Sequence, residues 1–131
     1  MQQPNSSQNN IALQCKVVLV GESGVGKTSL ISRYTSDTFS SVMLATTGAS
    51  FATRIYTLEE ENQDIKFEIW DTAGQEQFRS IAQIFYKNAS CCILAYDITR
   101  RKSFEEIKNY WIGEIRMNAP NDASNIYYSN F

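Results

Sequence analysis

The stretch Gly21-Glu22-Ser23-Gly24-Val25-Gly26-Lys27-Thr28 decides how this chain of 131 residues is interpreted. It fits the pattern G-x-x-x-x-G-K-[ST], which is typical of a phosphate-binding loop. The apolar run Cys15–Val20 precedes it and predicts a buried strand, and Leu30, Ile31 and Tyr34 follow it at helical spacing. A strand, a glycine-rich turn and a helix N-terminus together favour an anion site. The alternative is an ordinary glycine-rich turn between a strand and a helix.

Each part of this stretch has a predicted task. The backbone N–H groups of residues 22–28 can point inward at phosphate oxygens, and the glycines let the backbone close around them. Lys27 supplies a positive charge to the β- and γ-phosphates, and the Thr28 hydroxyl can ligate Mg²⁺. The candidate nucleotide-binding residues in this part of the chain are Glu22, Ser23, Gly24, Val25, Gly26, Lys27, Thr28 and Ser29.

Composition narrows the other possibilities. The formal net charge of −2 favours neither nucleic acid nor an anionic membrane as a partner. The chain has no histidine, which excludes Ser-His-Asp and Cys-His catalysis and histidine-ligated metal sites. Its three cysteines, Cys15, Cys91 and Cys92, lie in apolar runs without zinc-ligand spacing, which favours a reducing, intracellular compartment. Residues 1–13 open with an Asn/Gln-rich stretch that we expect to be a disordered tail and not a signal peptide.

The chain alternates between predicted strands and helices. Strands are expected at residues 15–20, 49–58, 64–70 and 91–96, and helices at 27–35, 77–87 and from Ser103 onward. The second and third strands are joined by a short loop and should be antiparallel. The fourth is apolar on both faces, as a central parallel strand is. The expected fold class is therefore α/β, a doubly wound, mostly parallel sheet of the P-loop NTPase kind.

The last predicted helix carries two specific expectations. Ser103 followed by Glu106 predicts a capping box at its start. Four large apolar side chains are expected on one face of it, Phe104, Ile107, Trp111 and Ile115.

A second chemical stretch, Asp71-Thr72-Ala73-Gly74-Gln75-Glu76, directly follows the third predicted strand. A carboxylate at the end of a strand beside a phosphate loop can hold Mg²⁺, commonly through a water. Gly74 lets a backbone N–H approach the γ-phosphate, and Gln75 can orient an attacking water. Alone, D-x-x-G is typical of a turn. Its place after a phosphate loop, followed by Gln-Glu, favours a nucleotide site.

Together with Tyr96-Asp97-Ile98-Thr99 and Phe78-Arg79-Ser80, these stretches resemble the Ras-type small GTPases of the Rab branch over roughly residues 14–118. The loop Thr46-Thr47-Gly48-Ala49-Ser50-Phe51 resembles the Rab switch I, with Thr47 where isoleucine is usual. Its Gly-Ala-Ser-Phe end, and the Gly-Glu-Ser of the phosphate loop, lean toward early-endosomal Rabs. The resemblance implies GTP/GDP and Mg²⁺ as cofactors and vesicle-mediated transport as the process. The implied partners are effectors, an exchange factor and a GTPase-activating protein.

The resemblance also implies roles for single residues. Thr46 would ligate Mg²⁺ and sense the γ-phosphate. The implied metal ligands are Thr28, Thr46 and Asp71, and the implied catalytic residues are Gln75, Lys27 and Thr46. Phe39 falls where the family places an aromatic ring against the guanine. The alternative for Phe39 is a loop aromatic folded onto its own helix.

Four further residues have an implied place in the family. Phe51, Trp70 and Phe85 fall at the Rab aromatic triad, which touches effectors, and the alternative for them is plain core packing. Arg79 is expected to be a surface charge, because the family receives its catalytic arginine from the activating protein.

The chain departs from the family after its last predicted helix. The motif N-K-x-D, whose aspartate reads the guanine edge, and the later S-A-K are absent from the sequence, and no cysteine lies near the C-terminus for a prenyl anchor. We therefore expect a C-terminally truncated GTPase domain at residues 14–118, lacking its last two strands and helices, and a non-matching tail at 119–131. The one strand-like candidate after the last helix is Asn125-Ile126-Tyr127-Tyr128. Without it, strand 91–96 would lie at an edge of the sheet, and apolar area beside helix 27–35 would be uncovered. One residue more than the usual spacing separates Phe104 from Trp111, unless Tyr110 takes the tryptophan's place.

Two functional hypotheses follow from the resemblance. The first is a Rab-like GTP-binding switch that hydrolyses GTP in the cytoplasm, and that reaches an endomembrane surface only if a prenylated full-length form exists. The second is a non-cycling fragment that at most docks partners through the switch and triad surface. A P-loop kinase or ATPase is disfavoured, because those proteins lack D-T-A-G-Q-E with an upstream Thr-x-Gly loop.

Overall fold

The computed structural model describes residues 12–36, 49–72 and 83–130. Its elements, in chain order, are β1 (Leu13–Val20), α1 (Lys27–Ser36), β2 (Ala49–Leu58), the 3₁₀ turn η1 (Glu59–Glu61), β3 (Gln63–Thr72), the 3₁₀ turn η3 (Gln83–Tyr86), β4 (Cys91–Asp97), α3 (Arg101–Glu106), the π-helical turn η4 (Ile107–Trp111), α4 (Ile112–Asn118) and β5 (Ser124–Asn130). The expected strands and the helix after the phosphate loop are confirmed. Leu13 already belongs to β1, so the structure contradicts the part of the tail prediction that reached residue 13.

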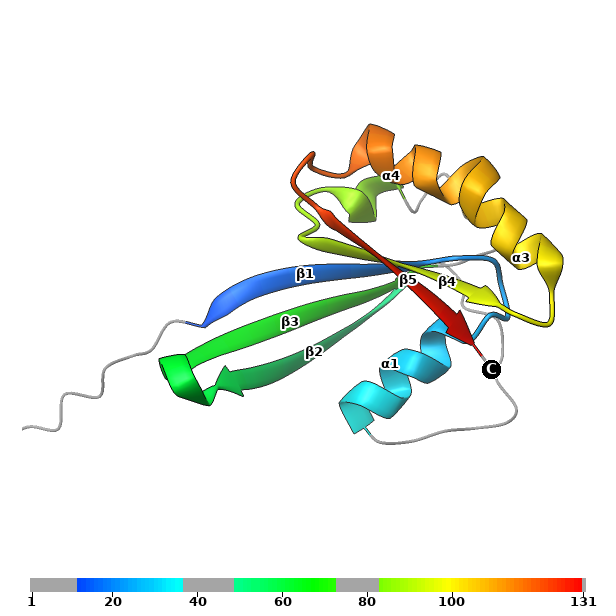
Figure 1. Ribbon diagram of the computed structural model, residues 1–131. Helices are drawn as coiled ribbons and strands as arrows, with labels where there is room; N and C mark the ends of the chain where they lie inside the picture. Colours follow the sequence, from blue (N-terminus) through cyan, green and yellow to red (C-terminus); the bar gives the residue numbers. More distant parts are fainter. Residues whose placement is uncertain (1–11, 37–48, 73–82, 131) are drawn as a thin grey trace, which may run out of the picture.

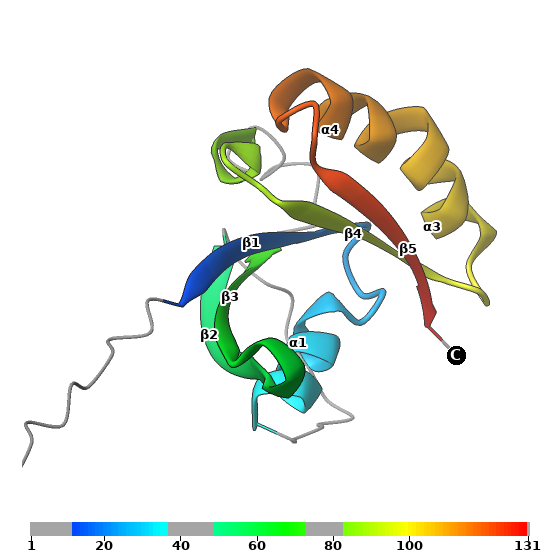
Figure 2. The same ribbon diagram turned by 60° about the vertical axis from the view of Figure 1, so that its left-hand side comes forward.

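The five strands form one sheet in the order β2-β3-β1-β4-β5 (Figure 1). β2 and β3 are antiparallel, as the short connection between them predicted, and the other three pairings are parallel. The helical rod formed by α3, η4 and α4 lies on one side of the sheet and α1 on the other (Figures 1 and 2). The mostly parallel, doubly wound α/β class is therefore confirmed.

One detail of the expected fold is wrong. The sequence predicted β4 at the edge of the sheet unless Asn125-Ile126-Tyr127-Tyr128 formed a strand beside it, and the truncated domain was expected to lack its fifth strand. In the structure β5 pairs in parallel with the whole of β4, from Cys91 opposite Ser124 to Asp97 opposite Asn130. The backbone of β4 therefore has a neighbour on both sides. The half-polar segment forms a strand because Ile126-Tyr127-Tyr128 favours one and the ladder of β4 offers it backbone partners.

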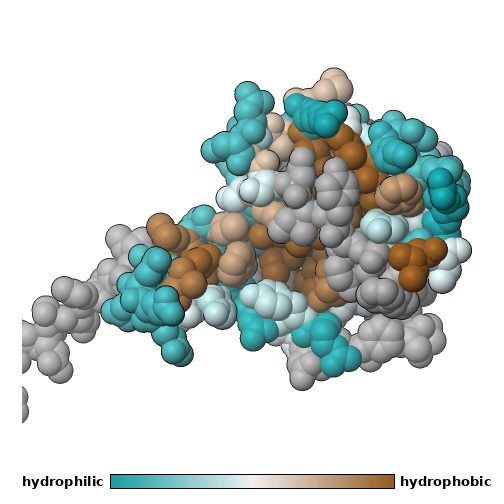
Figure 3. All heavy atoms as spheres, in the orientation of Figure 1, coloured by the Kyte–Doolittle hydropathy of each residue, from teal (hydrophilic) through white to brown (hydrophobic). Residues whose placement is uncertain are grey.

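Alternating residues of the strands build two cores, one on each side of the sheet. Beneath the rod of α3, η4 and α4 lies a well-buried cluster: Val18, Val20, Tyr86, Ala89, Cys92, Leu94, Ile107, Trp111 and Ile115. Among the described side chains, the buried cluster on the α1 side is smaller and consists of Val17, Leu19, Ile31 and Ile69. Around it Phe67, Cys91 and Ile93 are only partly buried. Apolar residues are visible near the middle of the molecule in Figure 3.

The helical rod differs from its prediction in two ways. Ser103 does not cap it, because the helix begins two residues earlier and the Ser103 side chain is fully buried. Its hydroxyl instead donates to the carbonyl oxygens of Arg100 (2.7 Å) and Asp97 (3.1 Å) and accepts from the Asp97 N–H (2.9 Å). In addition, residues 107–111 form a π-helical turn, which accommodates one extra residue per turn.

One predicted helix lies in a segment that the structure describes only in part. Of the helix predicted over residues 77–87, residues 83–86 form the 3₁₀ turn η3, and residues 77–82 lie outside the described residues.

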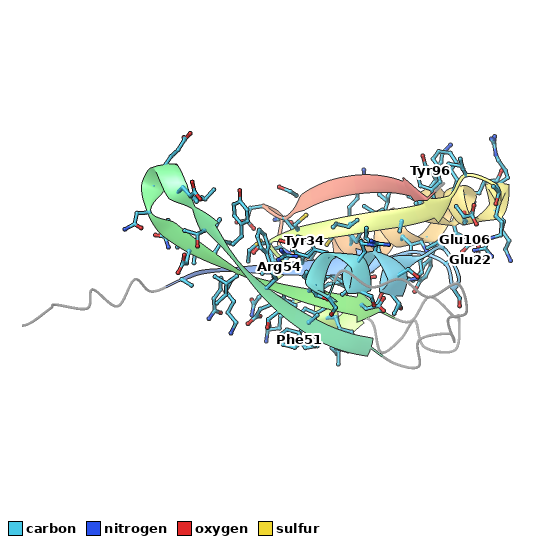
Figure 4. The ribbon with its side chains drawn as sticks, turned by 90° about the horizontal axis from the view of Figure 1, so that it is seen from below. Glu22, Tyr34, Phe51, Arg54, Tyr96 and Glu106 are labelled. Carbon is cyan, nitrogen blue, oxygen red and sulfur yellow. The ribbon has the colours of Figure 1, made fainter. Side chains whose placement is uncertain are left out.

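The end of α1 is joined to β2 by Arg54 (Figure 4). The Arg54 guanidinium lies 4.6 Å from the centre of the Tyr34 ring and donates to the Tyr34 carbonyl oxygen.

Candidate functional site

The glycine-rich loop joins β1 to α1 and is held against the end of β4. Gly21 packs so tightly that a Cβ there would lie 2.3 Å from the Ala95 carbonyl oxygen. Gly24 has a φ of +82°, a backbone conformation that strongly favours glycine. Val25 is completely buried beneath the loop. These constraints explain why the loop needs its glycines: they let it close tightly at the N-terminus of a helix, where backbone N–H groups can meet an anion.

Lys27, the first residue of α1, is buried under the loop, with 6% of its surface exposed. Its ammonium donates to the carbonyl oxygens of Gly21 (2.9 Å) and Glu22 (3.0 Å). Burial lowers the pKa of Lys27 to about 8, while the nearby Asp71 carboxylate acts in the opposite direction. A buried ammonium bound mainly to neutral carbonyls is well placed to gain an anionic partner such as a phosphate.

Thr28 and Asp71 meet although they are far apart in sequence. The parallel pairing of β1 and β3 sets Leu19 opposite Asp71 and brings the end of β3 beside the phosphate loop. The Thr28 hydroxyl donates to Asp71 Oδ2, and Asp71 has only 1% of its surface exposed. The next residue, Thr72, donates to the Leu19 carbonyl at 2.6 Å and so fixes the strand end. Adjacent hydroxyl and carboxylate oxygens are a donor set that fits Mg²⁺.

Arg100 contacts the outer side of the phosphate loop, although no motif in the sequence had marked it as a site residue. Arg100, between β4 and α3, donates to the Ser23 carbonyl oxygen at 3.0 Å. The same guanidinium lies 3.8 Å from the Glu22 carboxylate, which Lys102 also approaches at 3.8 Å. The only sequence pattern that hints at these contacts is the run of three basic residues after Thr99.

The three aromatic residues predicted to form a triad are brought together. The Trp70 ring centre lies 4.8 Å from that of Phe51 and 5.1 Å from that of Phe85. Phe51 remains 49% exposed, so it is not plain core packing. Lys16 lies over the Trp70 ring at 5.1 Å. The cluster therefore presents an aromatic surface beside a cation.

The remaining predicted site residues can be placed only in part. Ser29 lies in the first turn of α1, and the Gly26 carbonyl accepts the N–H of Leu30 at 2.9 Å. Phe39, Thr46, Gly74 and Gln75 lie outside the described residues. Within the described ranges no group of three or more Asp, Glu, Cys or His side chains could hold a metal ion. A magnesium ion would thus have Thr28 and Asp71 as ligands from this part of the chain, with the rest supplied by other groups such as nucleotide oxygens.

The profile of the Ras family matches residues 16–130 of this sequence. The chain belongs to the Ras family. The match includes residues 119–130, which the sequence analysis had set apart as a tail, and therefore includes β5.

Individual relatives place this Ras-family chain in the Rab branch. It is 44% identical over 113 residues to the GTP-binding protein ypt5 of Schizosaccharomyces pombe, covering 86% of this chain and 53% of the relative. It is 44% identical over 115 residues to the Ras-related protein Rab-8B of Homo sapiens, covering 88% of this chain and 54% of the relative. The identity to the Ras-related protein Rab-13 of Rattus norvegicus is 45% over 115 residues, or 88% of this chain and 55% of the relative.

The share of the relatives that is matched limits what this membership shows. The chain spans about half the length of the curated relatives it matches. The early-endosomal sub-branch stays a prediction, because relatives with different names match at nearly the same identity.

Among the described residues, no helix is both long and apolar enough to cross a membrane.

Proposed function

We propose that this Rab-branch chain binds GTP and GDP with Mg²⁺ and hydrolyses GTP, as a molecular switch in vesicle-mediated transport. The observation that supports this most directly is the meeting of Lys27, Thr28 and Asp71 at one end of the sheet. It combines a buried cation, a hydroxyl and a buried carboxylate at the N-terminus of α1, as a bound Mg²⁺-phosphate group requires.

The proposed roles follow from this placement. Lys27 binds the β- and γ-phosphates, and Thr28 and Asp71 hold the metal, Asp71 commonly through a water. Thr46 is the proposed third protein ligand. Gln75 orients the attacking water, and Phe39 stacks against the guanine. The bound magnesium ion supplies charge neutralisation for the transferred phosphoryl group.

The decisive experiment compares Lys27→Ala with the unaltered chain by titration with a fluorescent GDP analogue in Mg²⁺. We expect the substitution to abolish binding, because the phosphate charge loses its buried cationic partner. Lys87→Ala is the matched control, because that lysine is exposed and distant from the loop in sequence. Equal affinities of Lys27→Ala and the unaltered chain would exclude the phosphate-loop assignment.

Hydrolysis is tested separately from binding. Ras-type enzymes without an activating protein hydrolyse GTP at rates on the order of 10⁻⁴ s⁻¹. We expect a rate no faster than this, and a further decrease in Gln75→Leu, measured as single-turnover phosphate release. Identical rates in the two proteins would remove Gln75 from the mechanism.

The alternative function is docking of partners without nucleotide cycling, which would follow if these 131 residues alone form the nucleotide site. The chain contains neither N-K-x-D nor S-A-K, the motifs that hold the guanine in the family. Losing two charge-assisted hydrogen bonds of roughly 1.5–3 kcal/mol each would weaken binding by about 3–6 kcal/mol, or roughly 10²–10⁴-fold. Nucleotide extracted from freshly purified protein separates the two functions: recovered GDP or GTP supports the switch, and its absence supports docking without nucleotide cycling.

In either case the aromatic cluster of Phe51, Trp70 and Phe85 is the proposed effector surface. The exposed Phe51 ring and the neighbouring Lys16 give it an apolar centre with a cationic edge. Exchange factors and activating proteins are proposed partners on the strength of family membership. The proposed site of action is the cytoplasm.

A further inference from the structure

We propose that Arg100 is a positioning residue for the phosphate loop, which it braces and polarises from outside through the peptide that joins Ser23 to Gly24. This inference rests on the proposed phosphate site. It assigns a task to a residue on the connection between β4 and α3, outside the loop and outside the metal ligands.

The Arg100 backbone is fixed before its side chain reaches the loop. Its N–H donates to the Asp97 carbonyl at 3.0 Å, and its own carbonyl accepts the Ser103 hydroxyl at 2.7 Å. Asp97 is held in turn by the N–H of Thr99 (2.8 Å) and its hydroxyl (2.6 Å). The guanidinium therefore starts from an anchored turn at the end of β4.

The side chain then makes three contacts, two of them with the phosphate loop. It donates to the Ser23 carbonyl at 3.0 Å and lies 3.8 Å from the Glu22 carboxylate. A third contact, at 3.6 Å, is with the Asp97 carboxylate on its own turn. The Glu22 side chain is only 20% exposed and lies at the end of the molecule where β4 leads into α3 (Figure 4). An isolated exposed ion pair contributes little, but a guanidinium shared by a carbonyl and two carboxylates forms a network with a fixed geometry.

The direction of the Ser23 carbonyl determines the direction of a phosphate-binding group. Ser23 C=O and Gly24 N–H belong to one peptide unit, and the structure has no cis peptide bond in its described residues. In a trans peptide the C=O and N–H bonds point to opposite sides. Because Arg100 holds the carbonyl from outside, the Gly24 N–H points away from Arg100. In the proposed site that N–H is one of the donors to the phosphates.

Arg100 also changes the strength of that donor. A positive charge on a carbonyl oxygen polarises the peptide, and hydrogen bonds in a chain strengthen one another. The Gly24 N–H therefore becomes a better donor while Arg100 is in place. Arg100 is also close enough to Lys27 for its charge to contribute to lowering that pKa, which places both cations in the same local field.

The test uses Arg100→Gln in the full chain, with Arg101→Gln as the matched control. Arg101 carries the same charge one residue away, but its ion pair, at 3.3 Å, is with Glu105 on α3. The first measurement is the amide ¹H–¹⁵N resonance of Gly24 in ligand-free protein. We expect this resonance to move in Arg100→Gln and to stay in place in Arg101→Gln. A merely structural role for Arg100 would lower the melting temperature without singling out Gly24.

The second measurement is the affinity for GDP in Mg²⁺. We expect Arg100→Gln to bind about tenfold more weakly, equivalent to roughly 1.4 kcal/mol, Arg100→Lys to recover part of that loss, and Arg101→Gln to bind normally. An unmoved Gly24 resonance, or equal GDP affinities in Arg100→Gln and Arg101→Gln, would overturn the inference. If the unaltered chain bound no GDP, the proposed function would fail, and the Gly24 resonance alone would decide whether Arg100 braces the loop.

Discussion

At the scale of single residues, Lys27 shows how burial prepares a charge for a ligand. Its ammonium is bound by two carbonyl oxygens and its pKa is lowered to about 8, mainly by desolvation. The motif predicted the residue and its task. It could not predict the pKa, because that depends on how β4 and the Arg100 turn enclose the loop.

The lowered pKa makes nucleotide affinity depend on pH. A bound phosphate favours the charged ammonium, so the pKa in the complex is higher than in the free protein. Affinity for GDP should therefore be nearly constant up to about pH 7, about twofold lower at pH 8 and about tenfold lower at pH 9. Titrations between pH 7 and pH 9 check this. Lys27→Arg is the control, because arginine stays charged throughout and should show no such decrease even if it binds more weakly.

Ser103 was predicted to cap the helix, and that prediction is wrong. The pattern Ser-x-x-Glu is a good indicator of a helix start, yet here the hydroxyl is buried and ties the end of β4 to the turn before α3. The hydroxyl binds the backbone of Asp97 and Arg100 instead of capping a helix. These contacts form only when the helical rod packs on the sheet, so the local pattern does not predict them.

Removing the hydroxyl should destabilise the fold. Ser103→Ala leaves the Asp97 N–H without the acceptor it has in the structure, which costs about 1–3 kcal/mol. Thr57→Ala is the control, because it removes a hydroxyl that donates to Asp64 at an exposed position and should change stability by less than about 0.5 kcal/mol. Urea denaturation measures both. Equal midpoints would show that the buried hydroxyl contributes nothing.

At the scale of elements, the π-helical turn explains an oddity of spacing. Ser103, Ile107, Trp111 and Ile115 recur every four residues and all are buried. An α-helix has 3.6 residues per turn, so a strict spacing of four would drift around its surface. The wider turn at residues 107–111 takes up this drift and keeps Trp111 in the core. The sequence showed the extra residue, but not how the helix would absorb it.

The helical rod also contains a glycine that packing does not require. A Cβ at Gly113, in α4, would meet nothing within 4 Å. Gly113→Ala should therefore raise the free energy of unfolding by roughly 0.5–1 kcal/mol, because alanine loses less conformational entropy in a helix. Thermal unfolding followed by circular dichroism measures the shift. A decrease in the melting temperature would mean that the close neighbours of α4 are not as the structure describes them.

At the scale of the whole molecule, most of the sheet could be predicted, but the strand β5 at one of its edges could not be predicted with the same certainty. The β1–loop–α1 unit, the antiparallel β2–β3 pair and the parallel place of β4 all follow from local patterns. β5 follows from them only in part: Ile126-Tyr127-Tyr128 has strand character, but the rest of Ser124–Asn130 is polar. It is a strand because β4 offers an unpaired ladder, and long-range pairing of this kind leaves little trace in a local sequence.

Strand β2 lies at one edge of the sheet and carries exposed apolar side chains. Ile55 and Tyr56 on this edge strand are 60% and 53% exposed. Such an edge is a template for pairing with another chain, so we expect the isolated chain to self-associate at high concentration. Ile55→Lys should shift it toward monomer in sedimentation velocity, because a charged edge opposes pairing. Thr53→Ala, on the same face of the strand, is the control and should leave association unchanged, and a monomer in every variant would contradict the expectation.

The close approach of Gly21 to the Ala95 carbonyl has a consequence for how this sequence can vary. In a library of random single substitutions selected for folded protein, position 21 should be almost invariant. Any side chain there would have to displace the backbone of a central strand. Position 113 in the same library should accept most residues. The two glycines would thus differ in how many substitutions they tolerate. Gly21 is constrained by the neighbouring strand β4, whereas a Cβ at Gly113 would meet nothing within 4 Å.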